Sequence, residues 1–229
     1  MKRKMSKRYK KLFDLTKQRK IETLEEAIKK IKENCTAKFD ESIDVSMNLN
    51  LKSKKEEVSL RTVVNLPNGN GKKIKVAVLC EENKITEAKE SGADLFGSEN
   101  LINDISAGKI KFDKLVSTPT MMSKIGKLGK ILGPKGLMPN PKLGTVTADI
   151  KKSVKALKEG QIEIKNDKDG NVAASIGKKS FPDKKIIENF NSLLQTIIKE
   201  KPKGIKGDFI LSSYLTSTMG VSYKVKARI

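Results

Sequence analysis

Residues 66–79 have the sequence LPNGNGKKIKVAVL, and the hydrophobic pattern of the chain changes within them. NGNG, at 68–71, favours a flexible connection, because glycine adopts many backbone conformations. IKVAVL, at 74–79, is almost continuously apolar, which is typical of a strand covered on both faces. The stretch therefore predicts a boundary between two kinds of structure, with a hinge at 68–71.

The residues before this boundary have the pattern of an α+β domain. Thr23 and Glu26 form a capping box in front of an amphipathic helix predicted over 24–34. SIDVSMNLNL, at 42–51, alternates apolar and polar residues, which predicts a strand with one wet face. LRTVVNLP, at 60–67, is predicted to be its neighbour in the sheet.

The residues after the boundary alternate between strands and helices. Short helices are predicted to end at Gly92 and Gly108, and DKLVSTP, at 113–119, is a second buried strand. ADIKKSVKALKEG, at 148–160, predicts a helix that ends at Gly160. Such alternation indicates a parallel α/β unit.

After Gly160 the first pattern returns. QIEIK and NVAASI, at 161–165 and 171–176, predict a hairpin, and the tail 221–229 alternates again. Between them a long helix ends before Pro202. Its predicted apolar face comprises Ile186, Ile187, Phe190, Leu193, Leu194, Ile197 and Ile198.

The fold class expected is therefore α+β combined with α/β, in two domains. Residues 1–67 and 160–229 would form a discontinuous, split-β-α-β-like domain, interrupted by a Rossmann-like three-layer α/β domain at 68–159. Insertion into an exposed loop is well tolerated because domain termini often lie close together. The crossings at 68–71 and 159–160 would then form a hinge.

The net charge of +21 points to a polyanionic partner. Residues 1–20 alone hold ten Lys and Arg against one acid. Nucleic acid is the leading candidate, because each neutralised phosphate releases a counterion and adds affinity. An anionic membrane surface and a generally basic composition are the alternatives.

The composition excludes several kinds of chemistry. The chain has no histidine, so no Ser-His or Cys-His nucleophile can form, and two distant cysteines, Cys35 and Cys80, are too few for a zinc site. No cofactor or metal is expected. Two cysteines in 229 residues are typical of a reduced, cytoplasmic protein. No apolar run approaches the roughly 20 residues of a membrane span, and the basic N-terminus lacks a secretory apolar core, although a transit peptide stays open.

Residues 127–147, KLGKILGPKGLMPNPKLGTVT, form the most unusual stretch, with four glycines, three prolines and four lysines. The spacing does not match a P-loop, and no GxGxxG dinucleotide motif is present. Two interpretations stay open. Gly133, Gly136 and the prolines shape a rigid loop, and Lys127, Lys130, Lys135 and Lys142 make a secondary contact with phosphates.

The string ILGPKGLMPNPKLGTVT closely resembles the sequence of the L one family of bacterial large-subunit ribosomal proteins. TAKFDES at 36–42, GADLFG at 92–97 and SSYLTSTMG at 212–220 resemble the same family, so the resemblance spans the chain. It implies a non-catalytic protein, monomeric when free of the ribosome, that binds a large-subunit rRNA hairpin region and forms the mobile stalk near the tRNA exit site. It also implies assistance in release of deacylated tRNA and translational repression of its own operon mRNA.

The resemblance assigns the RNA-binding residues to two segments of the discontinuous domain. They are Lys38, Phe39, Glu41 and Ser42 in the first, and Ser212, Ser217, Thr218, Met219 and Gly220 in the second. Hydroxyl groups can bond 2′-OH and phosphate oxygens, Glu41 can accept from 2′-OH or base amino groups, and Gly220 permits close backbone approach. Many relatives have Thr at position 42, so Ser42 retains the hydroxyl. On sequence alone a core position is the favoured interpretation of Phe39, and only the resemblance reverses this.

Two other functions are alternatives to RNA binding in the ribosome. A nucleotide-dependent RNA-modifying enzyme would use the inserted α/β domain, but neither a fingerprint loop nor an acid/base pair is evident among Asp94, Asp104 and Asp113. A DNA-binding architectural protein fits the charge and not the motif. Aromatic residues are only 4% of the chain, which favours folded RNA over single strands.

Overall fold

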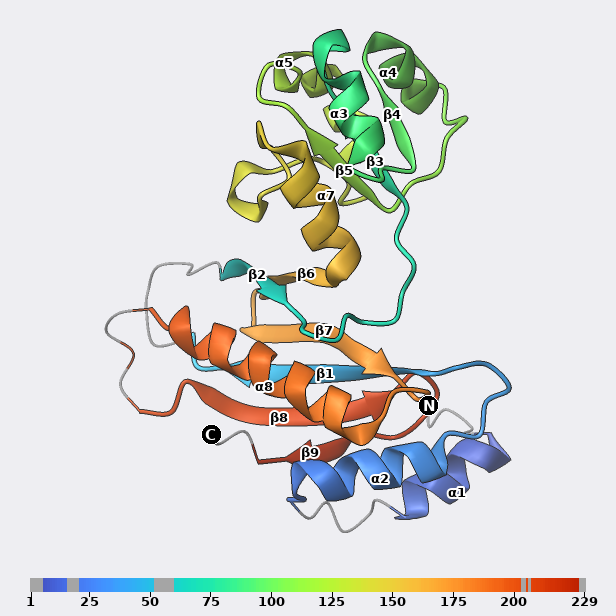
Figure 1. Ribbon diagram of the computed structural model, residues 1–229. Helices are drawn as coiled ribbons and strands as arrows, with labels where there is room; N and C mark the ends of the chain where they lie inside the picture. The colour runs from blue at the N-terminus through green and yellow to red at the C-terminus, as the bar shows by residue number, and fades with distance from the viewer. Residues whose placement is uncertain (1–5, 16–20, 52–59, 203–204, 206, 227–229) are drawn as a thin grey trace. The chain divides into compact units, whose positions relative to one another are not determined.

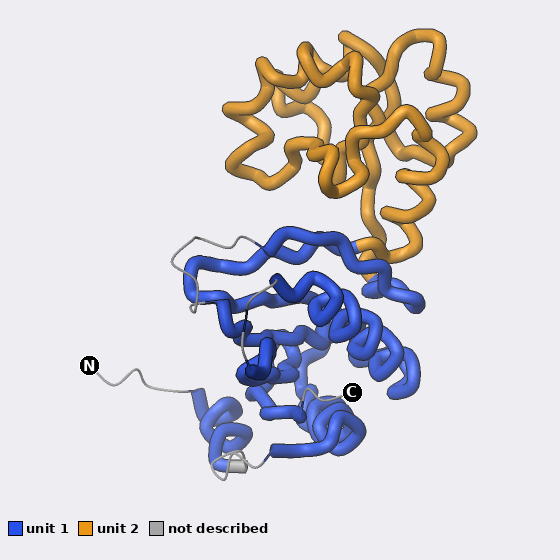
Figure 2. Tube along the Cα trace, turned by 90° about the vertical axis from the view of Figure 1, so that its left-hand side faces the viewer, with its two compact units in different colours: residues 1–71, 162–229 blue, residues 72–161 orange. Residues whose placement is uncertain are grey.

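The computed structural model describes residues 6–15, 21–51, 60–202, 205 and 207–226. It divides into two compact units, coloured separately in Figure 2. Unit 1 consists of residues 1–71 and 162–229, and unit 2 consists of residues 72–161. The mixture of α+β and α/β structure expected from the sequence is confirmed.

Unit 1 is built on a four-stranded antiparallel sheet. Its strand order is β7 (Asn171–Lys178), β1 (Ser42–Leu49), β8 (Ile210–Ser217) and β9 (Tyr223–Val225). The alternation in β1 is confirmed, because Ile43, Val45, Met47 and Leu49 are all buried. The strand's polar residues lie on the opposite face, since successive side chains of a strand alternate.

Helices cover the apolar face of this sheet (Figure 1). They are α2 (Leu24–Asn34) and α8 (Asp183–Lys199), and α1 (Lys7–Leu15) joins the same core through Leu12. The capping box is present as predicted, with Thr23 Oγ1 accepting from the Glu26 N–H. Most of the predicted apolar face of α8 is buried, but Ile187 is only partly buried and Ile198, in the last turn, is 42% exposed.

Two predicted strand pairings in unit 1 are wrong. Residues 60–67 were expected beside 42–51, but β2 (Arg61–Asn65) pairs with β6 (Gln161–Lys165) in a separate two-stranded sheet. β1 already has β7 and β8 as neighbours, and a strand has only two hydrogen-bonding edges. The predicted hairpin ladder of β6 and β7 is also not formed: the two strands lie in different sheets and are joined by one bridge, Asn166 to Val172.

The predicted C-terminal alternation is confirmed where the structure describes it. Val221, Tyr223 and Val225 are buried, whereas Ala227, Arg228 and Ile229 lie outside the described residues.

Unit 2 contains a three-stranded parallel sheet with helices on both faces. The order is β4 (Leu95–Gly97), β3 (Val76–Leu79) and β5 (Lys114–Ser117), and all four residues of β3 are buried, as its apolar run predicted. α3 (Ile85–Glu90) and α7 (Ile150–Glu159) cover one face. α4 (Glu99–Ser106), α5 (Met122–Ile125) and α6 (Gly129–Leu132) cover the other, and short 3-10 turns occupy 82–84, 126–128 and 141–143.

Both cysteines lie in the cores, Cys35 in unit 1 and Cys80 in unit 2, as free thiols. Burial raises the pKa of each thiol, so both behave as small core residues. Among the helices formed by described residues, none has the length and apolar character to span a membrane.

Candidate nucleic-acid interface

The two segments singled out in the sequence lie side by side at one end of the unit 1 sheet. β1 pairs with β8 so that Ile43 faces Ser217, which brings residues 36–42 next to residues 217–220. The Ser42 N–H donates to Thr218 Oγ1 (3.0 Å), and the Thr218 N–H donates to the Ser42 carbonyl (3.1 Å). We call residues 36–42 and 217–220 the paired loops.

A buried carboxylate joins the paired loops from the inside. Glu41 is 1% exposed, and its two carboxylate oxygens accept from the N–H groups of Ala37 and Met219, each at 3.1 Å. Burial by itself raises the pKa of Glu41, but hydrogen bonds from Ser217, Met219 and Ala37 outweigh it and hold the pKa below its ordinary value. The structure thus makes Glu41 a brace between the loops, without a free oxygen directed at solvent.

Arg8 on α1 holds the same loops from the outside. Its guanidinium donates to Thr36 Oγ1 and to the Met219 carbonyl, both at 2.9 Å. The positive charge also helps to lower the pKa of Glu41. Helix α1 therefore contributes directly to the geometry of the paired loops.

Residues 179 and 180 attach the first loop to the end of β7. The Ser180 N–H and hydroxyl donate to the Asp40 carboxylate at 3.1 and 2.8 Å. The Lys179 N–H donates to the Glu41 carbonyl (2.8 Å), and its ammonium donates to the Cys35 carbonyl (2.8 Å). Residues 36–42 are consequently bonded to three separate parts of unit 1.

The braced loops present an apolar pair to solvent. Phe39 is 52% exposed and Met219 is 46% exposed, and Lys38 and Thr218 are exposed beside them. The alternative that Phe39 is a core residue is thereby excluded. Exposed apolar side chains on a rigid frame are suited to contact a ribose or a base.

Ser217 and Gly220 make the turn of the second loop compact. Ser217 is 3% exposed, and the Gly220 N–H donates to its carbonyl (3.1 Å). A Cβ at position 220 would lie 2.3 Å from Ser217 Oγ. Glycine is therefore required at 220 by the Ser217 side chain within the chain itself.

Ser212 does not belong to the paired loops. It lies opposite Asn48 in the sheet, five residues before Ser217 along β8. An extended strand rises about 3.3 Å per residue, so the two serines are about 16 Å apart.

The 127–147 segment of unit 2 has a different construction. Leu128, Leu132 and Leu143 are buried and anchor it, and Lys127, Lys130, Lys135 and Lys142 are all exposed. Among the described residues none of these four lysines forms an ion pair. Gly136 has a φ of 66°, which favours glycine, but Gly133 has a φ of −57°. At Gly133 the constraint is space, since a Cβ would lie 2.6 Å from the Gly129 carbonyl oxygen.

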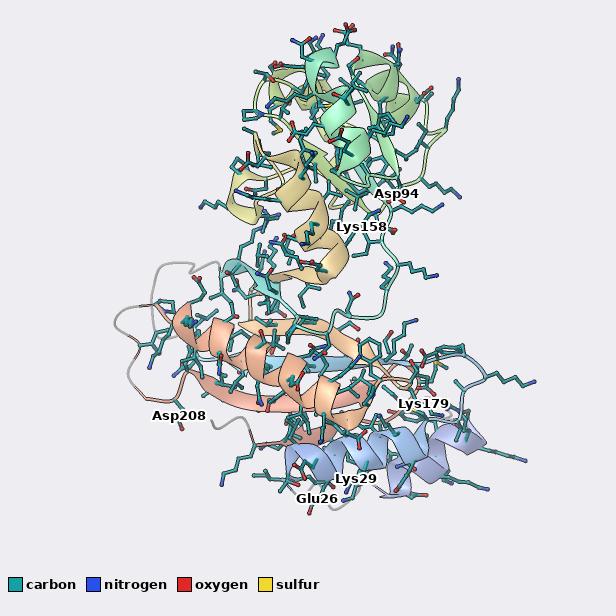
Figure 3. All side chains as sticks on the ribbon, viewed as in Figure 1. Glu26, Lys29, Asp94, Lys158, Lys179 and Asp208 are labelled. Carbon is teal, nitrogen blue, oxygen red and sulfur yellow. The ribbon has the colours of Figure 1, made fainter. Side chains whose placement is uncertain are left out.

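Two of the three acidic residues of unit 2 named as enzyme candidates, Asp94 and Asp113, have structural partners. The Asp94 carboxylate accepts from the Val76 N–H (2.9 Å) and pairs with Lys158 at 3.2 Å, two residues labelled in Figure 3. The Asp113 carboxylate accepts from the Lys75 N–H (3.0 Å). Within the described part of the chain, no group of three or more His, Cys, Asp or Glu side chains is placed to hold a metal ion.

Sequence reasoning did not select Arg8, Asp40 or Lys179 individually. Arg8 is one of ten basic residues in the first twenty, and only its tertiary contacts distinguish it. Asp40 lies inside the TAKFDES segment that carries the family resemblance, so its position in the sequence could have marked it as a residue of the site.

The family model and the individual relatives that match this chain all belong to one family of ribosomal proteins. The model of the Ribosomal protein L1p/L10e family matches residues 31–221. The large ribosomal subunit protein uL1 of Pelagibacter ubique (strain HTCC1062) is 57% identical over 222 residues, which cover 96% of this chain and 97% of that protein. The proteins of the same name from Rickettsia peacockii (strain Rustic) and Rickettsia bellii (strain OSU 85-389) are each 48% identical, over 88% and 87% of this chain and 84% and 83% of their own lengths.

Proposed function

The chain belongs to the Ribosomal protein L1p/L10e family, and we propose that it is a structural constituent of the large ribosomal subunit that binds large-subunit rRNA. The observation that carries the proposal is the construction of the paired loops. The buried Glu41 and the Arg8 guanidinium hold the two loops so that Phe39 and Met219 are exposed to solvent. The chain that carries them has a net charge of +21.

Affinity and specificity come from different residues in this proposal. Exposed lysines, including Lys38 in the paired loops and Lys7, Lys10 and Lys11 on α1, meet phosphates and supply affinity without sequence preference. Phe39, Met219 and the Thr218 hydroxyl supply recognition, because a preorganised apolar and hydroxyl surface fits only one folded RNA shape. Glu41 and Arg8 act through the loops as positioning residues.

The finer roles rest on the family resemblance. The protein forms the mobile stalk near the tRNA exit site, contacts exit-site tRNA during release, and represses its own operon by binding an mRNA site that imitates the rRNA. Units 1 and 2 are the discontinuous RNA-binding domain and the inserted domain. The hinge at 68–71 and 159–160 stays a prediction, and small-angle scattering that shows one unchanged compact shape with and without RNA would contradict it.

No catalytic role is proposed. The relatives are named as components of the ribosomal subunit, and Asp94 and Asp113 have backbone partners that explain them structurally. An inserted α/β unit without a fingerprint loop is compatible with a non-catalytic protein.

Binding to a stalk-rRNA hairpin over a salt series tests the proposal, with a scrambled hairpin of equal length as the control. We expect the true hairpin to bind about a thousandfold or more tightly and to keep that lead as salt rises. Equal binding of both RNAs, fading together with salt, would show that only the net charge is at work.

A further inference from the structure

Unit 1 carries a second group of exposed apolar side chains, away from the paired loops. Ile21, Ile198 and Leu211 are 62%, 42% and 57% exposed, and all three line one pocket of about 630 Å³. The end of α8 and strands β8 and β9 form its walls. A pocket of this volume is within the range that holds small organic groups.

A β-bulge accounts for the exposure of Leu211. Asn48 of β1 pairs with Ser212, but the next residue, Leu49, pairs with Ile210, so Leu211 has no partner across the sheet. Bulges redirect side chains and are frequent beside functional sites. Here the bulge places a leucine on the pocket wall instead of in the core.

The polar lining of the pocket favours an anion. Lys201, Lys224 and Lys226 line it, against one acid, Asp208. Lys201 donates to the Gly207 carbonyl (3.2 Å), whereas Lys224 and Lys226 form no ion pair with any residue that the structure describes. Ser212 also lines the pocket, and its hydroxyl has no hydrogen-bond partner among the same residues.

The pocket and the paired loops lie at opposite ends of the unit 1 sheet. Asp208 marks the pocket and Lys179 marks the paired loops, and Figure 3 shows them on opposite sides of the unit. Ser212 and Ser217 are about 16 Å apart along one strand, a distance that a short length of folded RNA can span.

We propose that this pocket receives one unpaired nucleotide of the RNA bound at the paired loops, an inference that rests on the proposed function. The base lies among Leu211, Ile21 and Ile198, and the phosphate meets Lys224 and Lys226. The Ser212 hydroxyl bonds the ribose 2′-OH. Folded RNA is recognised mainly at unpaired nucleotides, and an extruded base is held between apolar side chains. In this proposal the pocket gives Ser212, which is remote from the paired loops, a place in the RNA interface.

The experiment is a double-mutant cycle with full-length protein and the stalk-rRNA hairpin. Each unpaired nucleotide of the RNA is replaced in turn by an abasic residue, and each RNA is titrated with wild type and Leu211→Ala. We expect Leu211→Ala to weaken binding roughly five- to thirtyfold. For one position in the RNA, the abasic version should bind wild type more weakly than the intact RNA does, by the same factor. Leu211→Ala should bind that abasic RNA and the intact RNA equally well.

The salt dependence gives a second readout. Lys226→Gln should lower the slope of log affinity against log salt by about 1, and Leu211→Ala should leave the slope unchanged. Controls are Ile131→Ala and Lys168→Gln, which alter exposed residues outside the pocket. Leu211 is more than half exposed, so its truncation spares the core, and thermal unfolding verifies this.

The outcomes separate the two proposals. If wild type prefers the true hairpin and both Leu211→Ala and Lys226→Gln bind it as wild type does, the pocket does not hold RNA and the inference is overturned. The inference is also overturned if, for every abasic RNA, the loss of affinity from Leu211→Ala adds to the loss from the abasic residue. If wild type does not distinguish true from scrambled hairpin, the proposed function itself fails.

Discussion

The paired loops of unit 1 and the 127–147 segment of unit 2 both present exposed side chains to solvent, yet they are built in opposite ways. The paired loops are held by long-range hydrogen bonds that the Glu41 carboxylate accepts and that Arg8 and Ser180 donate. The 127–147 segment is shaped by its own glycines, prolines and buried leucines, and its lysines extend from it freely.

This difference suits the two surfaces to different tasks: specific recognition of one RNA shape, and electrostatic attraction of RNA phosphates. A surface that must fit one RNA shape has to be rigid before binding, since ordering it later costs affinity. A surface that attracts phosphates needs charge and permits mobile side chains. The most distinctive stretch of the sequence is therefore the weaker candidate for specific recognition.

The strongest test of the comparison removes the internal brace. Glu41→Ala should lower the free energy of unfolding of unit 1 by about 2–4 kcal/mol, because the partly buried N–H groups of Ala37 and Met219 both lose their acceptor. Specific RNA affinity should fall with it. Denaturant unfolding measures the effect, with Glu33→Gln on α2, which changes an exposed carboxylate, as the control.

The same variant can be tested through the pH dependence of its free energy of unfolding. The pKa of Glu41 is lowered in the folded chain, so its stabilisation is fully present above the unfolded-state pKa of about 4.3 and is lost as pH falls through the folded-state pKa. Between about pH 5 and pH 3, wild type should lose more stability than Glu41→Ala. Parallel losses in the two proteins would contradict the role of brace.

Truncating the exposed apolar pair tests recognition without disturbing the frame. Phe39→Ala and Met219→Ala should each weaken binding to the true hairpin roughly ten- to a hundredfold, as central apolar contacts do. Binding to the scrambled hairpin and the unfolding midpoint should barely change, because both side chains are about half exposed. Phe96→Ala in unit 2 is the matched control; an equal effect there would refute the assignment.

Adding one methyl group tests the compact turn. Gly220→Ala should cost about 1–3 kcal/mol of stability, because its Cβ meets Ser217 Oγ at 2.3 Å. In a Ser217→Ala background the same change should cost less, since the crowding oxygen is gone. Gly136→Ala is the comparison in unit 2, where nothing lies within 4 Å and only the positive φ is strained.

The smallest effects should come from the lysines of the 127–147 segment. Replacing Lys127, Lys130, Lys135 or Lys142 singly by Gln should weaken binding roughly two- to fivefold for any RNA. The ratio between true and scrambled hairpin should stay constant. Lys89→Gln on α3 is the control, and a change in that ratio would give the segment a part in specificity.

Much of the fold was predictable because local patterns decide it. The capping box at Thr23, the alternation in β1 and the continuous apolar run of β3 each indicated the right element. The strand pairings of β2 and β6 were not predictable, because any exposed strand edge can accept another strand and only the assembled sheet shows which edges are taken.

The sequence by itself determined the fold class, the charge and the segments that carry the family resemblance, because these depend on residue order and composition. Tertiary structure alone decided that Glu41 turns inward and Phe39 outward, two residues apart in one loop. It also decided that Arg8 donates to the carbonyl of Met219, 211 positions away, and that a bulge places the Leu211 side chain on the wall of a pocket. Burial and long-range hydrogen bonds depend on which segments meet in space, and no local pattern records that.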